Sequence, residues 1–496
     1  MKWIFWPLCL FVLNGLSTAA QAGALPPAVA RALAHASVPQ HAASFVVRSL
    51  EGDAPARLSH RADVAMNPAS VMKLVTTFSA LDMLGPDFTW KTSFYTDGSL
   101  GKGVLNGDLI IRGGGDPKWV LERIEDNFKT LQIMGVQRIT GDIILDNSVF
   151  ELSQRGSGDF DGEPLSPYNS TPDGLLVNFK AMLLTFTPDT QNQTVHIKSE
   201  PPIAGVTIDS TVAMGQGACG DWHSELAADF SDPNRIHFAG RYSERCGERV
   251  WPVAYSDPAS FATRVVKAMY GASGGVLQGQ VRIGHMPATA VLLWHAPSLP
   301  LSQIIADVNK YSNNVMAQQV FLSLSAQKSG ENPDNTAQGS FARSRDIVKR
   351  WWQRHFGHRL TASGRRTEDR KNHPIQAPAL ENGSGLSRSE RVSAQSLTEL
   401  LRTAAAHPAG PVFADSLSIA GVDGTAVNMA QRGIIQQAIG KAQLKTGSLR
   451  DVVAVAGYAM GKSGQRYSVV GIINHPNAHL ARPALDALVE WTVVEN

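Results

Sequence analysis

The sequence lacks several features that would assign a protein to a class at once. Its formal net charge of +2 argues against a general role in binding nucleic acid. Its 14 histidines show no paired metal-ligand spacing, so we expect no metal site. No long compositionally biased tract is present, and the 43% of hydrophobic residues is typical of a globular protein. A chain of 496 residues is too long for one ordinary domain, so two or three compact units are expected.

The apolar stretch near the N-terminus is short. It runs from Trp3 to Leu16, less than the ~20 residues that a membrane-spanning helix needs, so we expect no integral membrane anchor. Lys2 precedes this stretch, and Ala20-Gln21-Ala22 offers a cleavage site of the small-x-small type. We therefore predict that residues 1–22 are a signal peptide, removed after Ala22 on export.

Cysteine is scarce, with three residues in the chain. Cys9 lies in the predicted signal peptide and would be lost on processing. Cys219 and Cys246 remain as an even pair in an exported, oxidising setting, and no metal-ligand spacing surrounds either. We expect one structural disulfide, worth about 3 kcal/mol in the chain-entropy model. Two free thiols are the alternative.

Both ends of the chain contain short β-rich runs beside an apolar helix. Near the N-terminus, strands are expected at Ser44–Leu50 and Arg57–His60, followed by a helix from Asn67-Pro68 to Gly85-Pro86. Near the C-terminus, strands are expected at Leu444–Gly447, Val452–Met460 and Arg466–Ile473, followed by a helix at His479–Val493. This arrangement predicts one antiparallel sheet assembled from both termini.

The middle of the chain has a different composition. From about Trp90 to Met286 it is rich in Gly, Pro, Asp and short β-like runs, which is typical of inserted material. Helical periodicity returns from about Ser302. Residues 343–371 are strongly basic, and we interpret them as a solvated helix and an exposed loop. A patch that binds anionic wall polymer is the alternative for these residues.

A serine and a lysine three residues apart occur at three places, Ser70–Lys73, Ser99–Lys102 and Ser325–Lys328. At the first place a helix is expected to begin at Asn67-Pro68, and residues i and i+3 share one helix face, so the Lys73 amine can reach the Ser70 hydroxyl. The first turn of a helix also favours negative charge on the serine oxygen. The other copies lie in a Gly-rich turn and late in an expected helix. Ser70 is therefore the candidate nucleophile, provided that Lys73 is kept neutral by burial or by a neighbouring cation.

Two further motifs follow in order along the chain. Ser312-Asn313-Asn314 begins an expected helix and is the only Ser-x-Asn, and Lys445-Thr446-Gly447 lies on an expected strand and is the only Lys-Thr-Gly. Each of these short motifs, taken alone, occurs often by chance. Ser-x-x-Lys on a helix, then Ser-x-Asn, then Lys-Thr-Gly on a strand is a specific combination.

This set of motifs resembles that of the β-lactamases and penicillin-binding proteins. The 238 residues between Lys73 and Ser312 exceed what a compact β-lactamase accommodates. So long an insertion resembles the class C low-molecular-mass, type 4 penicillin-binding proteins, the D-alanyl-D-alanine carboxypeptidase/endopeptidase family. Stretches that match this family are Gly85–Phe88, Gly107–Leu109, Gly141–Asp146, Asn382–Arg388 and Ala420–Thr425. The chain departs from the family at Asn382, where Asp is expected, and in a longer basic loop at 359–371.

The resemblance implies an α+β fold. Its core is a transpeptidase-like domain with a five-stranded antiparallel sheet and helices, and this domain carries a large β-rich insertion of two nested domains. The expected boundaries are 23–90 and 290–496 for the core domain, 91–158 and 264–289 for domain II, and 159–263 for domain III. The cysteine pair falls in domain III.

The resemblance also implies the activity, a serine-type D-Ala-D-Ala carboxypeptidase or DD-endopeptidase acting on peptidoglycan stem peptides. Ser70 would attack the carbonyl of the penultimate D-Ala while Lys73 takes its proton. Ser312 would relay a proton to the leaving amine, and Asn314 would orient Lys73 and the substrate backbone. Lys445 would bind the terminal carboxylate and lower the pKa of Lys73.

Further binding residues come from the same resemblance. The backbone N–H groups of Ser70 and Ser448 would form the oxyanion hole, beside Thr446 and Gly447. An acid of the insertion would approach the amino group of the stem peptide; Asp161 is the candidate, and Glu163 is the alternative. The two-step reaction needs no metal or cofactor. β-Lactams would acylate Ser70, and the resulting acyl-enzyme would be hydrolysed only slowly.

Other interpretations remain. A β-lactamase of the same fold is disfavoured by the long insertion, and a non-catalytic wall-binding protein by the complete motif set. Gly271–Gly275 matches the nucleophile elbow Gly-x-Ser-x-Gly, but the expected helix precedes it and the strand follows it, so we interpret Ser273 as a turn residue. No amphipathic segment follows the last helix, so we expect a periplasmic enzyme, soluble or loosely membrane-associated. A homodimer is one candidate for the assembly.

Overall fold

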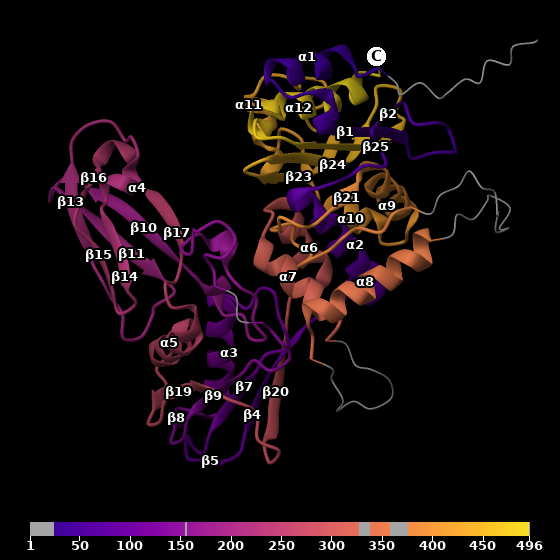
Figure 1. Ribbon diagram of the computed structural model, residues 1–496. Helices are drawn as coiled ribbons and strands as arrows, with labels where there is room; N and C mark the ends of the chain where they lie inside the picture. The colour runs from indigo at the N-terminus through magenta and orange to yellow at the C-terminus, as the bar shows by residue number, and fades with distance from the viewer. Residues whose placement is uncertain (1–23, 154–155, 327–337, 358–374, 496) are drawn as a thin grey trace, which may run out of the picture.

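The computed structural model describes residues 24–153, 156–326, 338–357 and 375–495 (Figure 1). The predicted signal peptide, Lys328 and the basic loop at 359–371 lie outside these ranges. None of the helices in the described ranges is long and apolar enough to span a bilayer.

One antiparallel sheet joins the two ends of the chain. Its strand order is β2-β1-β25-β24-β23-β22. The strands are β1 (Ala43–Ser49), β2 (Leu58–His60), β22 (Ser418–Ile419), β23 (Ala442–Leu449), β24 (Val452–Met460) and β25 (Arg466–Asn474). Indigo and yellow strands lie side by side in Figure 1, as a sheet assembled from both termini requires. The expected five strands are present, and the sixth, β22, is a two-residue edge strand too short to show a sequence pattern.

Helices cover both faces of this sheet (Figure 1). On one face lie α1 (Pro27–His35), α11 (Asn428–Gln431) and α12 (Arg482–Val494). On the other lie α2 (Lys73–Leu84), α6 (Leu301–Lys310), α7 (Asn314–Ser323), α8 (Phe341–Phe356), α9 (Ala394–Ala406) and α10 (Gly410–Asp415). Successive strand residues alternate between two apolar cores, with Phe45 and Val47 in one and Val46 in the other. Because both faces of the sheet are buried, the sequences of its central strands are nearly continuous hydrophobic runs.

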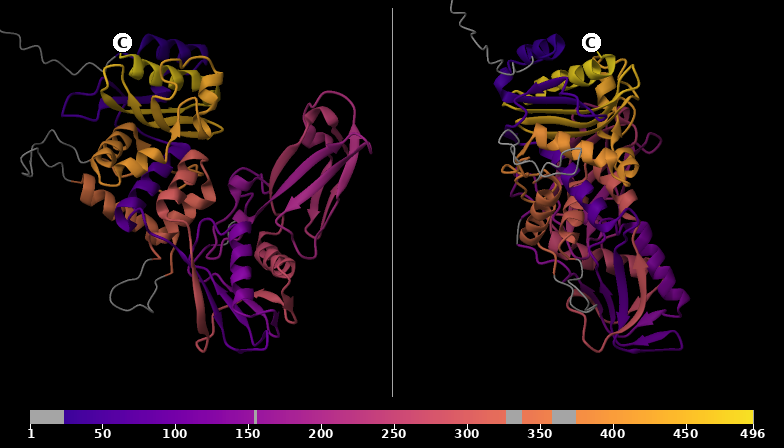
Figure 2. Two further views of the ribbon diagram at one scale, coloured as in Figure 1. Left: turned by 180° about the vertical axis from the view of Figure 1, so that it is seen from behind. Right: turned by 90° about the vertical axis from the view of Figure 1, so that its right-hand side faces the viewer.

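The long insertion lies between α2 and α6 and extends away from the sheet as a separate arm (Figures 1 and 2). Its part next to the core contains β4 (Lys91–Thr96), β5 (Ser99–Gly101), β6 (Val104–Asn106), β7 (Leu109–Arg112), α3 (Leu121–Ile133), β8 (Arg138–Ile139), β9 (Ile143–Asp146), α5 (Pro258–Ala272), β18 (Val276–Leu277), β19 (Val281–Ile283) and β20 (Val291–Pro297). These strands form sheets β19-β9-β7-β4-β20 and β18-β8-β6-β5. The domain boundaries stay predictions.

The outer part of the insertion is mostly strand. It contains β10 (Ala181–Asp189), β11 (Thr194–Glu200), β12 (Thr207–Ile208), β13 (Thr211–Gly215), α4 (Trp222–Glu225), β14 (Ala228–Asp232), β15 (Arg235–Phe238), β16 (Arg241–Ser243) and β17 (Arg249–Ala254). The strands form sheets β16-β13-β11-β10-β17 and β12-β15-β14. The predicted disulfide between Cys219 and Cys246 is present, with an S–S distance of 2.09 Å. It joins two segments beside the larger sheet.

The helix that carries the candidate nucleophile begins differently from the prediction. A 3₁₀ turn, Ala69–Met72, comes first, and the α-helix α2 starts only at Lys73. Asn67 is therefore not the N-cap of an α-helix; its Oδ1 accepts a hydrogen bond from the Ala69 N–H at 2.9 Å. Ala69 has a left-handed φ of 48°, which an α-helix cannot continue through. The tight turn displaces Ser70 from the regular helix.

The competing serines lie elsewhere. Ser99 begins strand β5 of the insertion, and Ser273 follows the C-terminal end of α5. Helix α5 precedes Ser273 and β18 follows it, so the order is the reverse of a nucleophile elbow. Ser325 is buried beyond α7 and its hydroxyl bonds to Ser340 and Ser344. Ser70 is the serine that the fold places beside the other two motifs.

Candidate active site

Ser70 and Lys73 lie one turn apart where the main sheet meets α2. Lys73 Nζ donates a hydrogen bond to Ser70 Oγ at 3.0 Å. Residues at i and i+3 lie on one face of a helical turn, which brings the amine and the hydroxyl together. The lysine is therefore within the distance at which it can accept the serine proton.

Lys73 is fully buried and is held by acceptors from distant segments. Its Nζ donates to Asn314 Oδ1 at 2.6 Å and to the Ser384 carbonyl at 2.5 Å. Burial lowers the pKa of Lys73 well below its usual range, and the nearby Lys445 ammonium lowers it further. The Glu390 carboxylate has the opposite effect and raises the pKa of Lys73. The net lowering favours the neutral amine that a general base requires.

Lys445 lies in the middle of β23 and is also fully buried. Its Nζ donates to the carbonyl of Thr446 at 2.8 Å. Burial lowers the pKa of Lys445 to about 7. Near neutral pH this lysine is therefore only partly protonated, and its influence on Lys73 depends on pH.

Ser312 and Asn314 come from the connection between α6 and α7. Ser312 has a left-handed φ of 59°, a conformation that costs a non-glycine residue about 1–3 kcal/mol. The next residue, Asn313, caps α7, because its Oδ1 accepts the Met316 N–H at 3.1 Å. Asn314 bonds to Lys73, whereas Ser312 lines a cavity together with Ser70. The turn thus directs the two polar side chains to different sides of the site.

Two glycines pack against the backbone of the nucleophile. A Cβ atom at Gly385, whose φ is 81°, would lie 2.0 Å from the Ala69 carbonyl oxygen and 2.8 Å from Ser70 N. A Cβ atom at Gly447 would lie 2.6 Å from the Pro68 carbonyl oxygen. Only glycine permits these approaches, which place β23 and the 382–388 loop directly against the Ser70 peptide group.

Asp161 belongs to the insertion and lies in an exposed loop. Its carboxylate accepts hydrogen bonds from the Tyr168 hydroxyl at 2.8 Å and from Asn169 Nδ2 at 2.7 Å. Partial burial alone would raise the pKa of Asp161, but these hydrogen bonds outweigh it and lower the pKa. The loop reaches the site, because the carbonyl of Tyr168 accepts a hydrogen bond from Asn314 Nδ2 at 3.0 Å.

Glu163, the alternative acid, is an exposed residue of the same loop. Its backbone N–H donates to Asp161 Oδ1 at 3.1 Å, and its carbonyl accepts from Asn169 Nδ2 at 2.9 Å. The Glu163 backbone therefore helps to hold the Asp161 carboxylate in place. The shared partner Asn169 favours Asp161 as the acid that the loop positions.

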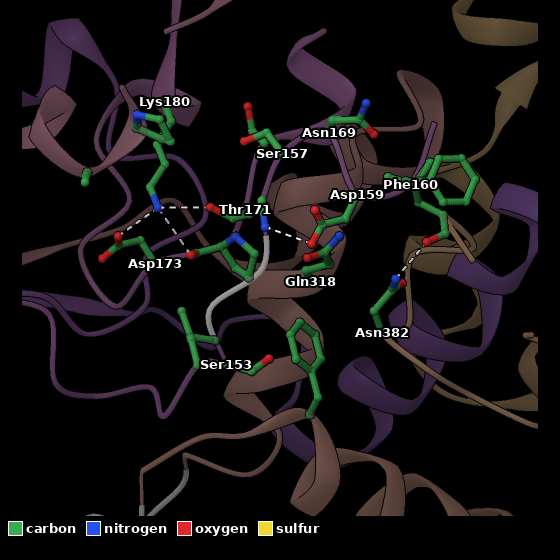
Figure 3. A pocket seen from close by; sticks show the side chains of 18 of the residues that line it. Ser153, Ser157, Asp159, Phe160, Asn169, Thr171, Asp173, Lys180, Gln318 and Asn382 are labelled. Atoms are coloured by element: carbon green, nitrogen blue, oxygen red, sulfur yellow. Dashed lines mark hydrogen bonds and ion pairs between the residues drawn. The ribbon is translucent and has the colours of Figure 1, made fainter. Parts of the chain in front are cut away.

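A cavity of about 900 Å³ lies beside this loop. Figure 3 shows that Asp159, Phe160 and Asn169 of the insertion line this cavity together with Gln318 of α7 and Asn382 of the core. At its far end Lys180 forms an ion pair with Asp173 at 2.9 Å (Figure 3). A cavity of this size, with polar groups on both walls, can hold a ligand of several residues.

Glu390 and Ser384 are site residues that sequence reasoning missed. Glu390 is fully buried, and its Oε1 accepts the backbone N–H groups of Glu381, Asn382 and Gly383 at 2.8–3.0 Å. It thus holds the loop whose Ser384 carbonyl accepts the Lys73 amine. A single glutamate in a polar loop gives no sequence signal, because only its burial in the folded protein distinguishes it from an ordinary surface glutamate.

Asn382, where the family resemblance predicts Asp, holds the backbone of the 382–388 loop. Its Oδ1 accepts the backbone N–H of Ser384 at 2.9 Å, and its Nδ2 donates to the Leu386 carbonyl at 2.9 Å. An aspartate could make the first bond but could not donate the second. Asparagine therefore suits this loop.

Comparison with known proteins identifies relatives of the whole chain. The sequence model of the D-Ala-D-Ala carboxypeptidase 3 (S13) family matches residues 25–351 and 371–494. The D-alanyl-D-alanine carboxypeptidase DacB of Haemophilus influenzae is 25% identical over 417 residues, which cover 82% of this chain and 80% of that protein.

Solved structures agree with this match. The crystal structure of penicillin binding protein 4 (dacB) from Haemophilus influenzae has a TM-score of 0.69 at 22% identity, and the match covers 90% of this chain and 96% of that chain. Its complex with a β-lactam has a TM-score of 0.66 at 20% identity, over 93% and 99% of the two chains. The predicted fold class, a sheet-and-helix domain that carries a β-rich insertion, is therefore confirmed.

Proposed function

The chain belongs to the D-Ala-D-Ala carboxypeptidase 3 (S13) family, and we propose that it performs its reaction through an acyl-enzyme on Ser70. It is a serine-type D-Ala-D-Ala carboxypeptidase, which acts on peptidoglycan peptides. The observation that supports Ser70 as the nucleophile is the hydrogen bond from Lys73, a buried amine with a lowered pKa, at 3.0 Å.

Acylation follows from the positions of these groups. Ser70 Oγ attacks the carbonyl carbon of the penultimate D-Ala as Lys73 takes the hydroxyl proton. The N–H groups of Ser70 and Ser448 stabilise the oxyanion that forms. Ser312 then passes its proton to the leaving amine and takes a proton from the Lys73 ammonium, and the C–N bond breaks. Asn314 keeps Lys73 in place through the 2.6 Å hydrogen bond.

Deacylation releases the shortened peptide. Lys73, neutral again, takes a proton from the water that attacks the ester carbonyl on Ser70, and it returns this proton to the serine oxygen as the ester bond breaks. These steps use only residues of this chain and water. A β-lactam places its strained amide at the same carbonyl position, so it acylates Ser70 and blocks it.

The insertion supplies the site for the acyl part of the substrate. We place the amino group of the stem peptide at Asp161, because hydrogen bonds from Tyr168 and Asn169 keep this carboxylate ionised and oriented. The adjacent cavity of about 900 Å³ has room for further residues of the stem. Carboxypeptidase and DD-endopeptidase reactions share this acyl part, and we propose DD-endopeptidase action on cross-linked peptides as a second activity. Periplasmic localisation and a homodimer stay predictions.

Covalent labelling with a fluorescent penicillin tests the nucleophile. The Ser70→Ala variant should lose all labelling, because no hydroxyl remains to form the ester. Ser99→Ala and Ser273→Ala should label as the wild type does, since both serines lie in the insertion away from Lys73. Labelling that survives Ser70→Ala would refute the assignment.

Purified muropeptides, analysed by mass, test the activities separately. Release of D-Ala from pentapeptides measures carboxypeptidase activity, and conversion of dimers to monomers measures endopeptidase activity. We expect both with the wild type and neither with Ser70→Ala.

A further inference from the structure

A second cavity, of about 440 Å³, opens directly beside the nucleophile. Its lining includes four residues of the three motifs, Ser70, Ser312, Thr446 and Ser448, and two arginines, Arg432 and Arg482. Arg482 is the first residue of α12, which packs on the opposite face of the sheet from α2. The cavity therefore extends from the reacting serine, past the Lys-Thr-Gly strand, to the C-terminal helix.

The two arginines of this cavity differ in their partners. Arg432 forms a bidentate ion pair with Asp486, a carboxylate that is only 1% exposed. Each oxygen of Asp486 accepts one of these hydrogen bonds, and the nearby charge of Arg482 also acts to lower the pKa of this carboxyl, although burial raises it overall. Arg482 is exposed; its Nη2 donates to Ser448 Oγ at 3.3 Å, and no ion pair to a carboxylate is found for it within the described ranges. One guanidinium of the cavity wall thus remains available to an anionic ligand.

The cavity lies on the side of Ser70 where the leaving group departs. Ser312, the residue that we expect to protonate the leaving amine, lines it. Asn314 instead lies on the side of the insertion, bonded to the Tyr168 carbonyl next to the Asp161 loop. The acyl part and the leaving part of the substrate therefore lie on opposite sides of the nucleophile.

Lys445 is poorly placed to bind an anion in this cavity. It is fully buried, it is absent from the lining, and its amine already donates to the Thr446 carbonyl. Burial also lowers the pKa of Lys445 to about 7. Arg482 instead lines the cavity, and the planar fork of its guanidinium matches the two oxygens of a carboxylate.

We propose that Arg482, together with the Ser448 hydroxyl, binds the α-carboxylate of the leaving D-amino acid. This proposal rests on the proposed function, since it places the leaving group with respect to Ser70. In D-Ala the carboxylate is one carbon away from the scissile nitrogen, so it lies next to the residues that hold the reacting carbonyl. Arg482 is then a specificity-determining residue, which selects substrates whose leaving group ends in a free carboxylate.

A pair of activated substrates tests this role without relying on slow amide cleavage. Both are N-acyl-D-alanyl thioesters; one has a leaving thiol with a carboxylate one carbon from sulfur, and the other has the methyl ester of that acid. For Arg482→Gln, kcat/KM on the carboxylate thioester and on an acyl-D-Ala-D-Ala peptide should fall about 10- to 100-fold, or about 1.4–2.8 kcal/mol. On the methyl ester it should stay unchanged. Arg482→Lys should give an intermediate loss on the carboxylate substrate.

Arg466→Gln is the matched control, because Arg466 lies at the far end of β25, where it pairs with Glu51, and is absent from the cavity lining. The Arg466→Gln variant should hydrolyse both thioesters with the wild-type kcat/KM. Equal losses on both thioesters with Arg482→Gln, or no loss on either, would overturn the proposal. A wild-type protein that hydrolyses neither thioester and takes no penicillin label would instead refute the proposed function.

Discussion

Replacement of Gly385 by alanine should displace the peptide group of the nucleophile. The added Cβ would lie 2.0 Å from the Ala69 carbonyl oxygen and 2.8 Å from Ser70 N, whereas ordinary contact begins near 3.4 Å. Relief of the first contact requires a shift of about 1 Å or more in a tightly packed turn. A misplacement of about 1 Å can lower a rate about 100-fold, and Ser70 N is one of the two proposed oxyanion donors. We therefore expect acylation of Ser70 to fall about 100-fold.

Gly464→Ala is the control for backbone strain alone. Gly464 has a φ of 86°, close to the 81° of Gly385, but no atom lies within 4 Å of its added Cβ. Both variants force alanine into a left-handed conformation, at about 1–2 kcal/mol each. Gly464→Ala should lose only this amount of stability and should acylate at the wild-type rate, because its turn joins β24 and β25 away from Ser70.

Urea unfolding and stopped-flow acylation by a fluorescent penicillin measure the two effects. Gly385→Ala should lose more stability than Gly464→Ala and should also acylate slowly. If Gly385→Ala acylates at the wild-type rate and is as stable as Gly464→Ala, the close packing of Gly385 on the Ser70 turn has no functional consequence and the reasoning fails.

Three further variants probe charge and cross-linking. Lys445→Gln removes the cation that lowers the pKa of Lys73, so the acidic limb of the acylation rate against pH should move to higher pH. Glu390→Gln removes the carboxylate that raises the same pKa, so the limb should move to lower pH; shifts in one direction for both variants would contradict this electrostatic account. Cys246→Ser breaks the disulfide and should cost the insertion about 3 kcal/mol in urea unfolding, while penicillin labelling of the core stays unchanged.

Local patterns were sufficient for the main sheet and for the motifs. Val452–Met460 and Arg466–Asn474 are long β-rich runs separated by a Gly-Lys-Ser-Gly turn, and the structure confirms them as β24 and β25. The disulfide followed from the even cysteine count. The predicted start of the helix at Asn67-Pro68 was wrong, because this dipeptide is also compatible with the 3₁₀ turn Ala69–Met72, against which Gly385 and Gly447 pack.

Local sequence patterns predict the main strands, the order of the three motifs and the choice of Ser70 over the other serines. These depend on propensities and spacings within a few residues. The groups that surround Lys73 become known only from the folded chain, since Asn314 and Ser384 are 241 and 311 positions away from it in the sequence. Burial, which lowers the lysine pKa values, and the cavity that exposes Arg482 beside Ser448 likewise arise when distant segments pack together.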